Sequence, residues 1–161
     1  MEQMMLEDFK PPYRYIIDSC SINAQKEDRN HRRSVYKSLW ANIENYMKNG
    51  IIVTCSEIWD EIKDVQIKEW LIQSRCQRID IDEDIQVNVR KIVTEHPKMI
   101  RFSNRGSSSG DPFLLATAIR HQLVIITEEG AGKNQLPSIS KFYNIDTVNI
   151  IGLCAREKWV F

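Results

Sequence analysis

The chain has 161 residues, of which 42% are hydrophobic and 27% are charged, a balance typical of an ordinary soluble globular protein. This length favours a single domain over residues 1–161, and no apolar run is long enough to cross a membrane. The formal net charge is zero, so binding of an anionic substrate would require a local basic patch or metal ions.

The cysteines and histidines indicate neither a disulfide framework nor a zinc site. No cysteine pair has the Cys-x-x-Cys spacing, and the three histidines share no metal-ligand spacing. We therefore expect buried free thiols in a reducing, cytoplasmic compartment.

The first half of the chain alternates between short apolar runs and amphipathic segments. Residues 1–12 are polar and end in two prolines, so we expect a loose N-terminal arm. A strand is predicted over Tyr13–Ile17, an amphipathic helix over Arg32–Lys48 and a second strand over Ile51–Val53. Thr54-x-x-Glu57 matches a capping box at the start of the next helix.

The second half continues this alternation. Further helices are predicted over residues 65–73 and Asp82–Glu95. A short strand over residues 99–102 and a Gly-Ser loop over residues 103–110 precede Asp111-Pro112, which is a helix-start signal. Strands follow over Leu123–Thr127 and Asp146–Ile151. Strands separated by long helices predict an α/β fold, a three-layer α/β/α sandwich with a central, mostly parallel sheet.

Acidic residues fall at the edge of this sheet where the strands end. Asp18 and the pair Glu128-Glu129 each follow a strand, and Asp111 begins a helix. Ligands of open parallel sheets bind at this edge, where the residues that follow the strands come together. Clustered carboxylates repel one another unless a cation lies among them, and oxygen ligands suit Mg²⁺ or Mn²⁺.

Each of these acids also has a simpler interpretation. Asp111 before a proline can be only an N-cap, and Asp18 after an apolar run can stabilise a turn. At least one of the two acids at 128 and 129 is expected to be plain surface. On the helix after Thr54, Glu61 lies closer to the buried stripe than Glu57, so Glu61 is preferred as the site residue.

Four motifs, in order, resemble those of a PIN domain (PilT N-terminal domain). The motifs are Tyr15–Ser19, Val53–Ile62 with Glu61, Gly110–Ala118 with Asp111, and Ile125–Glu129 with its acid two positions after a threonine. The resemblance covers essentially the whole length and is closest to an uncharacterised bacterial PIN-like subfamily related to VapC-like toxin ribonucleases. Two departures are Glu129, where many relatives have aspartate, and Ser138 after Pro137, where an acid is expected.

The resemblance implies an Mg²⁺- or Mn²⁺-dependent endoribonuclease in which a metal-activated water hydrolyses an RNA phosphodiester. It assigns the metal-ligating and catalytic roles to Asp18, Glu61, Asp111 and Glu129. Ser19 and Thr127 would hydrogen-bond the ligands or the water. The basic residues expected to contact RNA phosphates are Lys26, Arg29, Arg32 and Arg33. The alternative interpretation is that they belong to an ordinary solvated helix start.

The resemblance also implies a cognate antitoxin as a partner and a homodimer as the assembly. One alternative is a catalytically silent PIN-like binding module or antitoxin-associated partner. Another is a phosphatase with Asp18 as nucleophile, but that mechanism expects a second acid where Cys20 stands.

Overall fold

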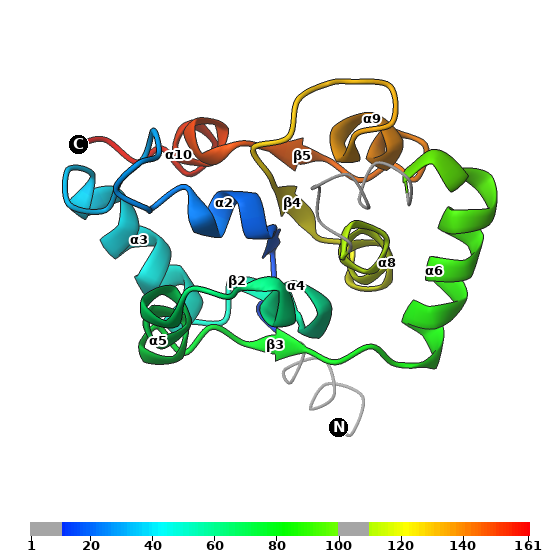
Figure 1. Ribbon diagram of the computed structural model, residues 1–161, viewed down its shortest axis with the longest axis horizontal. Coiled ribbons are helices and arrows are strands. Elements are labelled where there is room, and N and C mark those ends of the chain that lie inside the picture. The colour runs from blue at the N-terminus through cyan, green and yellow to red at the C-terminus, as the bar shows by residue number, and fades with distance from the viewer. Residues whose placement is uncertain (1–10, 100–109) are drawn as a thin grey trace, which may run out of the picture.

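A parallel β-sheet forms the centre of the molecule (Figure 1). The computed structural model describes residues 11–99 and 110–161. Within these residues the strand order is β3-β2-β1-β4-β5, and every pairing is parallel. The strands are β1 (Tyr15–Ile17), β2 (Ile52–Cys55), β3 (Arg78–Ile79), β4 (Val124–Ile126) and β5 (Thr147–Val148).

Helices cover both faces of the sheet. They are α2 (Ser19–Asn23), α3 (Lys37–Lys48), α4 (Ser56–Glu61), α5 (Val65–Gln73), α6 (Glu83–Glu95), α8 (Asp111–His121), α9 (Leu136–Lys141) and α10 (Ile150–Glu157). In Figure 1 the strands lie between α3, α5 and α10 on one side and α6 and α8 on the other. The predicted three-layer α/β/α fold with a parallel sheet is therefore confirmed.

The central strands and the helix faces over them form the core. All residues of β1 and β2 are buried, as expected for strands covered on both faces. Helix α3 contributes Leu39, Trp40, Ile43 and Met47, most of which recur every four residues along one face. The predicted start of this helix at Arg32 is wrong, because residues 32–36 form turns and Val35 is 65% exposed.

One local pattern led to a wrong assignment, and some short elements were missed. Thr54 belongs to β2 rather than to a capping box, because its hydroxyl is buried and donates to the Ile17 carbonyl at 3.1 Å. Helix α4 accordingly starts at Ser56 and has no side-chain cap bond. The short elements α2, β3 and α9 were not predicted. By contrast, Asp82 does cap α6, accepting from the Ile85 N–H at 2.8 Å.

Some expectations concern residues 1–10 and 100–109. The loose N-terminal arm over residues 1–12, the strand over residues 99–102 and the loop before Gly110 lie largely outside the described residues. Among the helices that the structure describes, none has the length and apolar character required to span a membrane.

Candidate metal centre

The strand order reverses between β1 and β4. From β1 the sheet continues to β2 and β3 on one side and to β4 and β5 on the other, and ligands of such sheets bind outside the carboxyl ends of the strands at this point. Asp18 follows β1 directly and Thr127 follows β4 directly. Because Ile17 is paired with Ile126, these two residues are brought side by side, and the Asp18 N–H donates to the Ile126 carbonyl at 2.9 Å.

Both oxygens of the Asp18 carboxylate accept hydrogen bonds. Oδ1 accepts from the Ser19 N–H at 2.7 Å, and the Ser19 hydroxyl lies 3.5 Å away. Oδ2 accepts from the Thr127 hydroxyl at 2.9 Å and from the Cys20 thiol at 3.0 Å. The carboxylate is only 1% exposed and also caps α2, so its orientation is set from several directions.

Cys20 is a site residue that the sequence interpretation missed. Its sulfur lies 3.3 Å from the Thr127 hydroxyl and accepts from the Glu128 N–H at 3.3 Å, in addition to donating to Asp18. Burial raises the pKa of the Cys20 thiol, which therefore stays protonated and remains a donor. The available signal was its position two residues after the first acid, on the first turn of α2.

The two acids after β4 contact different helices. The Glu128 carboxylate accepts from the Ile150 N–H at 2.8 Å and so lies at the start of α10. Glu129 accepts from the Leu136 N–H at 3.3 Å at the start of α9, and its own N–H donates to the Thr127 hydroxyl at 3.2 Å. Thr127 therefore links Glu129 to Asp18, whereas Glu128 is held away at another helix.

Asp111 lies at the beginning of α8, but it is not the N-cap. The cap is Gly110, with Asp111 and Pro112 as the first helical residues, and Asp111 is 2% exposed. The Gly110 N–H donates to the Glu61 carboxylate from α4. A Cβ at Gly110 would lie 2.9 Å from both Glu61 Oε1 and Ile58 Cδ1, so a side chain here would displace one or both of these α4 side chains.

Three of the four expected carboxylates form a compact group. Asp18, Asp111 and Glu129 can each offer an oxygen such that these atoms all lie within 4.8 Å of one another. Asp18 and Asp111 are buried and Glu129 is half-buried. Glu61 is not a member of this group but bonds to the residue that precedes Asp111.

Burial and the neighbouring carboxylate disfavour the ionised form of Asp18. The pKa of Asp18 is raised to about 6, mainly by burial and also by the nearby charge of Glu129. Hydrogen bonds from Cys20, Thr127 and the Ser19 N–H act in the opposite direction. A positive ion among these oxygens would relieve the repulsion and the cost of burial.

The four basic residues expected to contact RNA lie on the segment between α2 and α3. They are Lys26, Arg29, Arg32 and Arg33. Arg29 is exposed, with its Nε 3.6 Å from a carboxylate oxygen of Asp28. The Arg33 guanidinium lies over the Trp70 ring, 5.7 Å from its centroid. Lys26 and Arg33, unlike Arg29 and Arg32, line a common pocket.

The doubly wound parallel sheet has a fold similar to that of solved VapBC structures. One similar solved structure is DNA-bound VapBC from Salmonella typhimurium, at 16% identity and TM-score 0.53, covering 86% of this chain and 98% of that chain. Another is VapBC2 from Rickettsia felis bound to a DNA fragment from their promoter, at 18% identity and TM-score 0.52, covering 84% and 97%. These likenesses establish the fold.

The chain belongs to the family described as a domain of unknown function (DUF4411), whose model matches residues 15–161. No curated protein matches the sequence.

Proposed function

We propose that the protein is a metal-dependent ribonuclease of the toxin type. The observation that carries the proposal is the group formed by Asp18, Asp111 and Glu129, with carboxylate oxygens within 4.8 Å of one another. This group lies at the switch point of a PIN-like sheet, where such folds bind their ligands.

The donor set fits Mg²⁺ or Mn²⁺. All three ligand candidates are carboxylates, the hard oxygen donors that these ions prefer, and two are buried where uncompensated charge is costly. When bound, such an ion lowers the pKa of a water and offsets negative charge on a phosphodiester undergoing hydrolysis.

The protein's own contacts prepare the carboxylates for this role. Thr127 and Cys20 donate to Asp18 Oδ2 and the Ser19 N–H donates to Oδ1, so these contacts would hold the carboxylate in one orientation for an ion. The Leu136 N–H at the start of α9 donates to Glu129 Oε1 and orients that side chain. Partners that orient ligands in this way typically change metal affinity about 10- to 100-fold when removed.

Glu61 is proposed as the fourth acid of the site. Its Oε1 accepts from the Gly110 N–H, so it holds the start of α8 and thereby the position of Asp111. Glu61→Gln distinguishes metal ligation from support of the start of α8. The amide retains an acceptor for the Gly110 N–H but is a poorer ligand for a hard cation.

RNA is the proposed substrate, and a cognate antitoxin is the proposed partner. The basic segment that follows α2 supplies Lys26, Arg29, Arg32 and Arg33, which would give a neutral protein a local surface for phosphates. An antitoxin is supported by the similarity to VapBC, determined as a DNA-bound complex in Salmonella typhimurium.

Cleavage of single-stranded RNAs with Mn²⁺ or with EDTA tests the proposal. We expect cleavage by the wild type only with the metal, and loss of activity in Asp18→Asn and Asp111→Asn. Asp60→Asn, a change at an exposed residue of α4, is the control and should remain active. Cleavage that persists in EDTA or in Asp111→Asn would show that the carboxylate group is not the active site.

A further inference from the structure

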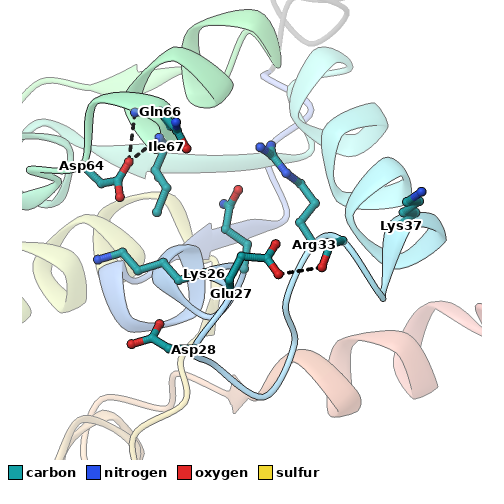
Figure 2. A pocket seen from close by; sticks show the side chains of 10 residues that line it. Lys26, Glu27, Asp28, Arg33, Lys37, Asp64, Gln66 and Ile67 are labelled. Carbon is teal, nitrogen blue, oxygen red and sulfur yellow. Dashed lines mark hydrogen bonds between the residues drawn. The ribbon is translucent and has the colours of Figure 1, made fainter.

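A pocket lies between the α2–α3 segment and the start of α5 (Figure 2). Its volume is about 650 Å³, within the range of about 300–1,000 Å³ typical of small-molecule sites. Gln25, Lys26, Arg33, Lys37 and Asp64 are among the residues that line it. The inference drawn from this pocket rests on the proposed ribonuclease function and concerns its substrate.

The acidic residues around the pocket are engaged by the protein itself. Glu27 accepts from the Ser34 hydroxyl at 2.7 Å, and Asp64 caps α5 by accepting from two backbone N–H groups at 2.9 and 3.1 Å, as Figure 2 shows. Asp28 lies 3.6 Å from the side chain of Arg29. Their negative charges are therefore partly compensated.

The basic residues of the pocket are not compensated in this way. Within residues 11–99 and 110–161, neither Lys26 nor Lys37 nor Arg33 forms an ion pair. Arg33 instead lies over Trp70, whose ring packs edge-on against Trp40 at 5.6 Å between centroids. This stacking holds the guanidinium in place while leaving its donors for an anion. These three cations are therefore available to an anionic group such as a phosphate.

Gln25 adds a separate requirement for a hydrogen-bond donor. It is only 4% exposed, its Nε2 donates to the Ile22 carbonyl at 2.9 Å, and its backbone carbonyl accepts from the Arg33 N–H at 2.9 Å. Its Oε1 has no hydrogen-bond partner in the part of the chain that the structure describes. Buried acceptors are nearly always paired, so a ligand or water must supply the missing donor.

We propose that this pocket binds one nucleotide unit of the RNA strand. Its phosphate contacts Lys26, Arg33 and Lys37, and a donor from the same unit, either the sugar 2′-hydroxyl or a base N–H, pairs with Gln25 Oε1. Gln25 follows Asp18 by seven residues, with the five-residue helix α2 between them, so one short segment joins the acidic group to the pocket. The proposed path of the RNA strand runs from the acidic group to this pocket.

Binding of fluorescent single-stranded oligonucleotides in EDTA tests the phosphate contacts without cleavage. Lys37→Gln should reduce the slope of log affinity against log salt by about 0.7, which corresponds to about fivefold weaker binding at 0.1 M salt. Lys48→Gln is the matched control, because Lys48 is an exposed lysine at the other end of α3 and outside the pocket. Equal effects of the two substitutions would overturn the proposal.

The hydrogen bond from the ligand is tested with Gln25→Met, which retains the length of the side chain but removes both the Oε1 acceptor and the Nε2 donor to the Ile22 carbonyl. We expect about fivefold weaker binding, the effect of one hydrogen bond, with an unchanged salt slope. A loss seen with RNA but not with DNA identifies the sugar hydroxyl, and a loss seen with both identifies the base. Unchanged affinity for every oligonucleotide, in a variant with wild-type melting, would show that only water occupies this acceptor and would refute the proposal.

Cleavage assays on the same variants separate this inference from the proposed function. If Mn²⁺ supports no cleavage while Lys37 and Gln25 still control binding, the nuclease assignment fails and the nucleotide pocket stands. If the enzyme cleaves RNA but binding ignores both residues, the nuclease assignment stands and the pocket is refuted.

Discussion

Because the Asp18 carboxylate is buried, we expect that replacing it by a neutral side chain stabilises the metal-free protein. In Asp18→Asn we expect the free energy of unfolding at pH 7.5 to rise. Burial raises the folded-state pKa from an ordinary 3.8 to about 6, a difference of roughly 3 kcal/mol at about 1.4 kcal/mol per pKa unit. The amide avoids this cost but fits the donors from Thr127 and Cys20 less well, so we expect a net gain of about 1–3 kcal/mol.

The pH dependence has a definite sign. Between pH 3.8 and about 6 the folded protein binds the Asp18 proton more tightly than the unfolded chain does. The stability from this group is therefore complete below pH 3.8 and is lost as the pH rises through 6. The advantage of Asp18→Asn over the wild type should be largest above pH 7 and should nearly vanish by pH 4.

Urea unfolding in EDTA, followed by circular dichroism from pH 4 to pH 8, measures this difference. Asp60→Asn is a suitable control, because Asp60 is exposed and its replacement should change stability by less than about 0.5 kcal/mol. A lower stability of Asp18→Asn at pH 7.5, or a difference from the wild type that does not depend on pH, would refute the reasoning about the buried charge.

Substitutions at three further positions test the contacts around the site. Gly110→Ala places a methyl group against the Glu61 carboxylate and should destabilise the protein by about 1–3 kcal/mol in urea unfolding; wild-type stability would contradict this close approach. Thr127→Val should weaken Mn²⁺ binding about 10- to 100-fold by calorimetry, whereas Thr127→Ser should bind normally. Cys20→Ala should lower Mn²⁺ affinity while Cys20→Ser retains it, since serine keeps a donor to Asp18; equal losses would assign Cys20 a packing role.

The strands and their end residues were accessible from sequence because local chemistry determines them. The β-branched runs around Ile16 and Ile125 are typical of buried parallel strands, and an acid directly after such a run lies at the binding edge of the sheet. The proximity of Asp18 and Thr127 follows from the pairing of β1 with β4. Thr54 was misassigned because its hydroxyl bonds across the sheet rather than to a nearby helix start.

Contacts between distant segments were not accessible in this way. The Glu61 bond to Gly110 joins residues 49 positions apart and depends on how α4 packs against α8. The thiol of Cys20 contacts Thr127 across 107 positions, and no periodicity or spacing encodes that pairing. The difference between Glu128 and Glu129 is likewise set by which helix start each carboxylate reaches.

The central claim is that Asp18, Asp111 and Glu129 together hold a divalent cation. Titration of the metal-stripped protein with Mn²⁺, with free Mn²⁺ followed by electron paramagnetic resonance, tests it without any assumption about substrate. Saturable binding by the wild type, lost in Asp111→Asn and Glu129→Gln and retained in Asp60→Asn, is the predicted result. Binding that is absent from the wild type, or unchanged in Asp111→Asn, would contradict the account.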